Sequence, residues 1–441
     1  MRNRHVGLRG ALRHLMTGAV VEKVATVASG LVLLRLLPLE EYGALVLAYS
    51  TFSLIDLAAG LAMNDLVVSR SASAKGSNDD AGSQRLVGSF LFWSATGLVA
   101  VAAAAAAAKP LLTAYLPSLD LYFWWVLVAG LTTPIRNLLI TLFRVDHDFA
   151  AVKRTDIARS CGLAAGYVVF IGAAGWGLVG GLIAYIASSL LPVVLAVRPL
   201  SRMLHGIAPW LRPRPLMELM GDEGKWQAAR YSITALHGTA RPWLIQAVLG
   251  LEAVALFNAA KSVLGVPADL LPIKEALIPL MSREAAHPAS LRRLYAQSLR
   301  YAVLVFGLLG LAIAAAAPFV FGWLFPQYRE AVALIQLMSL SYLATGIATP
   351  QASVMYALRL QRFYFSTTML NFVLLFALGI PLMLRFGVNG MGIAFVVGAA
   401  ALSFLRERHL RAVCPALRVT ARELLFARAP RAEPLEVPRW R

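Results

Sequence analysis

The chain has 441 residues, of which 59% are apolar and 15% are charged, and its mean hydropathy is +0.68. Soluble proteins carry about a quarter charged residues, so this composition excludes an ordinary water-soluble enzyme. A net charge of +18 would suggest nucleic acid as a partner of a soluble protein. Here most Lys and Arg residues lie in short connections between apolar segments, so we expect an all-α polytopic membrane protein with no nucleic-acid partner.

Apolar segments of about 18–26 residues recur along the chain, and each is long enough to cross a hydrocarbon core of about 30 Å. They predict twelve transmembrane helices, at 17–37, 43–66, 86–108, 120–143, 157–174, 177–197, 226–249, 253–278, 299–320, 329–350, 363–384 and 387–405.

The connections between these spans differ in charge. Most of the 41 Lys and Arg residues lie in one set of connections: 1–16, 67–85, 144–159, 198–225, 281–300, 359–362 and 406–441. The opposite set holds Lys109, Arg329 and Arg385. Because positive loops stay in the cytoplasm, we expect both termini to be cytoplasmic and the number of spans to be even.

The chain also repeats itself with a shift of about 210 residues. Gly177-Leu-Val-Gly180-Gly-Leu-Ile-Ala184 aligns with Gly387-Val-Asn-Gly390-Met-Gly-Ile-Ala394, and each segment opens the last span of a set of six. Six spans per half give both halves the same orientation, which is the parallel-repeat plan of transporters that alternate access to a site between the repeats. The predicted parts are an N-terminal six-helix bundle (1–197), a cytoplasmic linker (198–225), a C-terminal six-helix bundle (226–405) and a disordered basic cytoplasmic tail (406–441).

Four segments resemble the bacterial polysaccharide flippases of the Wzx type. They are Leu33-Leu-Arg35-Leu-Leu-Pro-Leu-Glu-Glu-Tyr42-Gly43, the two Gly-x-x-Gly-x-x-x-Ala segments above, and Pro279-Leu-Met-Ser-Arg283. These flippases belong to a superfamily that also contains the MATE multidrug exporters and the lipid II flippase. The resemblance implies a transporter of the bacterial inner membrane. It would move an undecaprenyl-diphosphate-linked oligosaccharide to the periplasmic leaflet, for exopolysaccharide, O-antigen or capsule. Its partners would be this cargo, membrane lipids, and polysaccharide polymerase and export proteins.

A polar stripe marks the seventh span. Gln227, Arg230, Thr234, His237 and Arg241 recur every three or four residues, which places them on one helical face. Because a polar stripe cannot face lipid, we expect it to line a water-filled cavity where the two arginines bind phosphate oxygens. Alternatively, the arginines snorkel to opposite interfaces, although about 16.5 Å of helix separates them at 1.5 Å per residue.

Other charged residues lie within the predicted spans. Basic residues exceed acidic ones there, which favours an anionic cargo over an organic cation. Arg35 is near an outer end, so anchoring at the interface is an equal alternative for it. The acidic residues would balance the cavity arginines or carry a coupling H⁺ or Na⁺. The additional cavity candidates are Lys23, Arg35, Arg136 and Lys261, and the coupling or charge-balancing candidates are Glu22, Asp56 and Asp269.

The connections give no sign of an enzyme. The longest outer loops have only about a dozen residues, and the chain contains neither a phosphate-binding GxxxxGK[ST] loop nor a metal-ligand cluster. We therefore expect no catalytic residue, no metal and no cofactor. Two functions remain as alternatives to a flippase: a MATE-like small-molecule exporter coupled to H⁺ or Na⁺, and a non-transporting membrane scaffold that recruits partners through its basic tail.

Overall fold

The computed structural model describes residues 8–60, 63–76, 79–115, 120–146, 148–201, 210–219, 225–270, 277, 280–281, 284, 287–358 and 360–419. Within these ranges the regular elements are helical, and no strand is present. This confirms the predicted all-α class. The physical reason is that a chain crossing lipid must satisfy its backbone N–H and C=O groups internally.

Nine helical segments in the described ranges are long and apolar enough to cross a membrane: Leu39–Gly60, Asp80–Leu111, Phe123–Val145, Phe149–Ala173, Gly177–Leu195, Ala289–Leu324, Ala331–Ala357, Arg362–Phe386 and Val388–Val413. The three other predicted spans also lie on helices, α1 (Leu8–Leu36), α10 (Lys225–Leu249) and α11 (Leu251–Leu270). Charged and polar side chains, such as the stripe on α10, make these helices less apolar. The chain is a multi-pass membrane protein.

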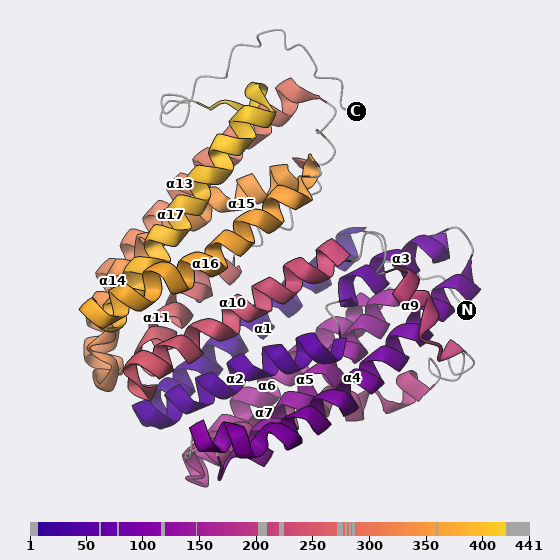
Figure 1. The fold of residues 1–441 in the computed structure, drawn as a ribbon, viewed down its shortest axis with the longest axis horizontal. Helices are drawn as coiled ribbons and strands as arrows, with labels where there is room; N and C mark the ends of the chain where they lie inside the picture. The colour runs from indigo at the N-terminus through magenta and orange to yellow at the C-terminus, as the bar shows by residue number, and fades with distance from the viewer. Residues whose placement is uncertain are drawn as a thin grey trace. The chain divides into compact units, whose positions relative to one another are not determined.

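The chain forms two compact units, Met1–Trp243 and Leu244–Arg441. Unit 1 contains α1, α10 up to Trp243, and the indigo to magenta helices of Figure 1. These are α2 (Leu39–Gly60), α3 (Asn64–Gly76), α4 (Asp80–Tyr115), α5 (Phe123–Val145), α6 (Phe149–Gly166), α7 (Gly177–Leu195) and the short α9 (Arg214–Leu219). A π-helical stretch, Tyr167–Ala173, continues α6.

Unit 2 contains the end of α10, α11 and the salmon to yellow helices of Figure 1. These are α13 (Pro288–Phe319), α14 (Ala331–Ser339), α15 (Ser341–Ala357), α16 (Gln361–Phe386) and α17 (Val388–Val413). Two single turns of 3₁₀-helix, η6 (Pro326–Tyr328) and η7 (Pro415–Leu417), precede α14 and follow α17.

The same helix neighbours recur in both units, as the internal repeat predicts. In unit 1, α2 packs against α4, α5 and α7, and α6 packs against α7. In unit 2, α11 packs against α13, α14 and α17, and α16 packs against α17. The predicted tenth span is divided into α14 and α15, so one helix of the first half corresponds to two consecutive helices of the second.

The repeated glycines have the same structural role in each unit. Gly177 and Gly387 both have positive φ, at +49° and +59°, where the chain turns into α7 or α17. Gly180 and Gly390 then approach the backbone of the preceding helix: a Cβ on Gly180 would lie 2.8 Å from the Phe170 carbonyl oxygen, and one on Gly390 would be closer still to that of Leu382. Positive φ and such close approach both favour glycine. These geometric requirements explain why the motif recurs.

A carboxylate on α2 caps the N-terminus of α7. Glu41 Oε2 accepts a hydrogen bond from the Leu178 backbone N–H at 2.8 Å. Because a helix N-terminus has unpaired N–H groups and a positive dipole end, Glu41→Ala should destabilise unit 1 by about 1–2 kcal/mol, and Glu41→Gln by less. Thermal unfolding of the purified protein in detergent measures both. Equal unfolding temperatures for Glu41→Ala and the wild type would show that this cap contributes nothing.

Part of the predicted linker is folded onto unit 1. The Pro213 carbonyl accepts hydrogen bonds from Ser89 Oγ at 3.1 Å and Trp93 Nε1 at 3.0 Å, and Leu216 N–H donates to Ser89 Oγ at 3.0 Å. Leu216 is also buried among apolar side chains of α3, α4 and α5. The prolines of 198–225 predicted a linker, and no pattern in the sequence indicated this docking.

The C-terminal end also differs from expectation. Residues 406–413, assigned to the disordered tail, continue α17, and 414–419 form the η7 turn and an ordered segment. Leu417 and Val419 are buried there, where they pack against apolar side chains of the unit 2 helices. Residues 420–441 lie outside the described chain.

Candidate functional site

The interior of unit 1 holds a group of polar side chains on four apolar helices. Asp56 lies on α2, Arg136 and Asn137 on α5, Arg159 on α6, and Tyr185 on α7. The packing of α5 against α2, α6 and α7 brings these helices together. We call these five residues the unit 1 polar cluster.

Asn137 connects the carboxylate of the cluster to one of its guanidinium groups. Its Nδ2 donates to Asp56 Oδ2 at 2.8 Å, and its Oδ1 accepts from Arg136 Nη2 at 2.7 Å. A side-chain amide suits this place because it is both donor and acceptor. Within the described part of the chain, Asp56 and Arg136 form no direct ion pair.

Arg159 lies against an aromatic ring. Its guanidinium carbon is 5.4 Å from the ring centre of Tyr185, which is a cation–π arrangement. The Tyr185 hydroxyl is 2.9 Å from Thr133 Oγ1, and its ring packs 4.8 Å from that of Phe52. Tyr185 is therefore held from two sides. Arg159 follows the start of α6 by about ten residues, or about 15 Å of helix, and the preceding part of this helix also carries Lys153, Arg154 and Asp156.

Both guanidinium groups retain unused donors. The Nε atoms of Arg136 and Arg159 are buried and have no hydrogen-bond partner among the described residues. Arg136 is repelled by Arg159 and attracted by Asp56 and Asp156. These four charges balance formally, yet in the described ranges neither carboxylate hydrogen-bonds to a guanidinium. An anion that reached these buried groups would find N–H donors that no carboxylate occupies.

The predicted stripe on α10 is described only in part. His237 and Arg241 lie together on one face, with Arg241 Nη2 3.1 Å from His237 Nε2. Arg241 is buried and Thr234 is exposed. The side chains of Gln227 and Arg230 lie outside the described residues.

The remaining predicted residues are distributed over both units. Glu22 on α1 forms an ion pair with Lys153 on α6 at 2.9 Å, and its sequence neighbour Lys23 is half-buried. Arg35 and Lys261 are exposed. The side chain of Asp269 lies outside the described residues. Of the predicted set, the unit 1 polar cluster contains only Arg136 and Asp56.

Sequence reasoning missed three residues that matter in this cluster: Asn137, Arg159 and Tyr185. Arg159 was counted with the cytoplasmic charges of 144–159, although the helix carrying it is continuous with an apolar span. Arg159 lies within the predicted span 157–174, and Asp156 precedes it by three residues on the same helix; a basic residue inside a predicted span was the signal available.

The residues of the cluster are suited to binding an anion. Among the described residues that were searched, no group of three His, Cys, Asp or Glu side chains is placed to hold a metal ion. Guanidinium, amide and phenol groups on rigid helices can instead donate hydrogen bonds to an anion.

Comparisons with solved structures show the fold. An inward-facing multidrug resistance MATE transporter of the MOP superfamily matches with a TM-score of 0.73 at 15% identity, over 90% of this chain and 98% of that chain. A MOP superfamily transporter from Pyrococcus furiosus matches with a TM-score of 0.64 at 15% identity, over 93% of this chain and 97% of that chain. A Vibrio cholerae MATE transporter matches with a TM-score of 0.60 at 15% identity, over 92% of this chain and 96% of that chain.

Comparison of sequences gives the family. No curated protein matches the chain significantly. A family model described as "Polysaccharide biosynthesis protein" matches residues 32–333, which is more than half of the chain. The chain therefore belongs to this family of polysaccharide biosynthesis proteins and has the fold of the MOP superfamily transporters.

Proposed function

We propose that the chain is a flippase that moves a polyprenyl-diphosphate-linked oligosaccharide to the outer leaflet of the bacterial inner membrane, for surface polysaccharide biosynthesis. The observation that carries this proposal is the pair of guanidinium groups, Arg136 and Arg159, whose buried Nε–H groups lack acceptors in the described chain. Family membership supports a role in polysaccharide biosynthesis, and the fold supports transport.

The chemistry of the cargo suits this pair. A diphosphate carries several acceptor oxygens and a charge of about −2, and a guanidinium binds such oxygens through a planar fork of N–H groups. In the empty state Asp56 and Asp156 offset the positive charge without contacting it. The cost of two unpaired guanidinium groups inside an apolar bundle is thereby reduced until the cargo supplies the direct hydrogen bonds.

Movement of an anion outward is electrically favourable. With the cell interior negative, each negative charge gains about 2.3 kcal/mol per 100 mV. An ion gradient would therefore not be needed to drive the cargo outward, and it would serve to return the empty carrier to its starting conformation. The matched MATE transporters are recorded in inward-facing and outward-facing states, which supports alternating access for this chain. The polyprenyl tail would stay in lipid while the headgroup crosses.

Other residues have secondary roles in the proposal. His237 and Arg241 on α10 would supply further polar contacts to the headgroup, and Asp56 would balance charge or carry a coupling H⁺. We also propose that both termini are cytoplasmic, in keeping with the loop charges.

The cargo is tested directly in cells that lack the protein. We expect polyprenyl-diphosphate oligosaccharide to accumulate in the lipid extract, with its sugar facing the cytoplasm and with surface polymer missing. Re-expression of the wild-type chain should restore the polymer and serves as the control. Intact surface polymer, no accumulated lipid and new sensitivity to cationic drugs would instead identify an exporter.

A further inference from the structure

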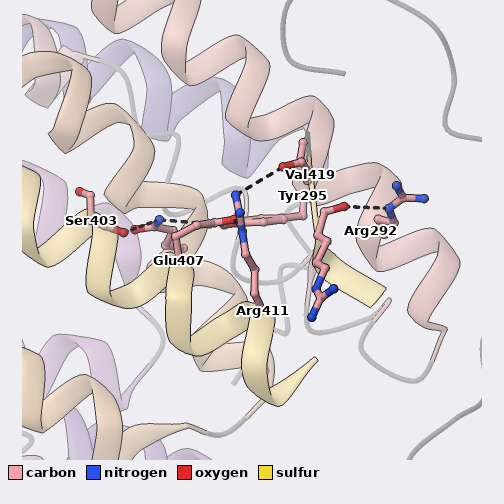
Figure 2. A network of polar contacts seen from close by, with 8 residues as sticks. Arg292, Tyr295, Ser403, Glu407, Arg411 and Val419 are labelled. Carbon is pink, nitrogen blue, oxygen red and sulfur yellow. Dashed lines mark hydrogen bonds and ion pairs between the residues drawn. The ribbon is translucent and has the colours of Figure 1, made fainter. Parts of the chain in front are cut away.

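The ordered segment after α17, Cys414–Val419, closes one end of unit 2, and we call it the C-terminal clasp. A single carboxylate organises the contacts beneath it (Figure 2). Glu407 Oε2 accepts from the Tyr295 hydroxyl at 2.6 Å and from Gln351 Nε2 at 3.3 Å, and Glu407 Oε1 accepts from Arg411 Nε at 2.8 Å. Glu407 thereby joins α13, α15 and α17.

Arginines of two helices hold the backbone of the clasp, as Figure 2 shows. Arg411 Nη2 on α17 donates to the Val419 carbonyl at 3.4 Å, and Arg292 Nε on α13 donates to the Arg418 carbonyl at 3.3 Å. Leu417 and Val419 pack into the apolar cluster that includes Leu291 and Tyr295. The clasp therefore brings Arg418 between the arginine-bearing ends of α13 and α17.

The exposed face of α13 changes from apolar to basic toward this end. Leu308, Leu304, Tyr301 and Arg293 follow one another at helical spacing, and all four are exposed. Leucines suit acyl chains, tyrosine suits the interface, and arginine suits the headgroup level. Arg293 thus lies beyond the apolar part of this face, on the side where the order of residue types predicts lipid headgroups.

The exposed face of α17 shows the same change. Val397 and Phe404 are exposed apolar residues, and Arg408 follows Phe404 by one turn on the same face. Within the described residues, the side chains of Arg293, Arg408 and Arg418 make no hydrogen bond or ion pair. Arg293 adjoins Arg292, Arg408 adjoins Glu407, and Arg418 belongs to the clasp, so the three arginines lie on the segments that meet at this end of unit 2.

We propose that the clasp and the adjoining ends of α13 and α17 form a binding site for the phosphate headgroup of an anionic phospholipid in the cytoplasmic leaflet. Arg293, Arg408 and Arg418 bind the headgroup, and the acyl chains lie along the exposed apolar faces of the two helices. Charge complementarity and the matched apolar-to-basic faces select this partner. The bound lipid stabilises the clasp and so keeps the ends of α13, α15 and α17 together. This site is independent of the proposed cargo.

Lipid binding is measured on the purified full-length chain in detergent, by thermal unfolding with added phosphatidylglycerol. We expect phosphatidylglycerol to raise the unfolding temperature more than phosphatidylcholine does. Each of Arg293→Gln, Arg408→Gln and Arg418→Gln should weaken the apparent affinity about fivefold. Arg385→Gln is the matched control, because it removes an exposed arginine from the end of α16 that lies away from the clasp. It should leave the affinity unchanged.

Several outcomes would overturn the site. They are equal stabilisation by both lipids, an unchanged affinity in all three variants, or a preference for polyprenyl diphosphate over phosphatidylglycerol that the same variants abolish. If a Gln variant unfolds during purification, the Arg→Lys variant at the same position is measured in its place. It keeps the positive charge and should therefore retain a preference for phosphatidylglycerol. Loss of that preference in a folded Lys variant would also contradict a headgroup site.

Discussion

The double variant Arg136→Gln, Arg159→Gln is expected to abolish surface polysaccharide while the protein remains in the membrane at close to its normal amount. Each charge-assisted hydrogen bond contributes about 1.5–3 kcal/mol, so losing two lowers cargo affinity about 10²- to 10⁴-fold. Folding should tolerate the change because neither guanidinium forms an ion pair in the described structure, and Asp56 keeps its hydrogen bond from Asn137. Polymer at the cell surface and protein in the membrane fraction are the two measurements.

Matched variants separate recognition from general effects of charge. Arg154→Gln removes an exposed arginine from the same helix as Arg159, and it should leave polymer export unchanged. Arg159→Lys keeps the charge but loses the planar fork, so partial export is expected. Normal export from the double variant would contradict the assignment of Arg136 and Arg159 to the cargo.

Much of the architecture could be predicted from the sequence because lipid leaves few structural choices. Long apolar segments can only be helices, and the repeated Gly-x-x-Gly segments indicated two related halves. The structure supplies the reason for that repeat, since Gly177 and Gly387 share a positive φ and Gly180 and Gly390 share a close approach to backbone. Both requirements act locally, within one turn or one pair of neighbouring helices, which is why they can be recognised in the sequence.

The site was less predictable because its residues come from different helices. The stripe on α10 has a helical period, so His237 and Arg241 could be placed on one face from spacing alone. The contact between Arg159 on α6 and Tyr185 on α7, and the bridge from Asp56 through Asn137 to Arg136, depend on tertiary packing. No spacing rule within one segment reports such contacts. Loop charges even suggested a cytoplasmic position for Arg159.

The largest effect on stability is expected from Gly390→Ala. A Cβ at this position would overlap the backbone of Leu382 in α16, and backbone cannot move aside as a flexible side chain can. Overpacking of this kind costs about 1–3 kcal/mol or more, which for a unit of this size lowers the unfolding temperature by roughly 5–10 °C. Thermal unfolding of the purified protein and its yield from membranes both report the change.

The repeat supplies the companion variant, and an open glycine supplies the control. Gly180→Ala should also destabilise the protein, but by less, because its Cβ would stand 2.8 Å from the Phe170 carbonyl oxygen, a less severe overlap than at Gly390. Gly307→Ala places a methyl group in α13 where no atom lies within 4 Å, and it should be neutral or slightly stabilising, since alanine favours helix. If Gly390→Ala and Gly307→Ala unfold at the same temperature, the close packing of α16 on α17 is not what requires the repeated glycine.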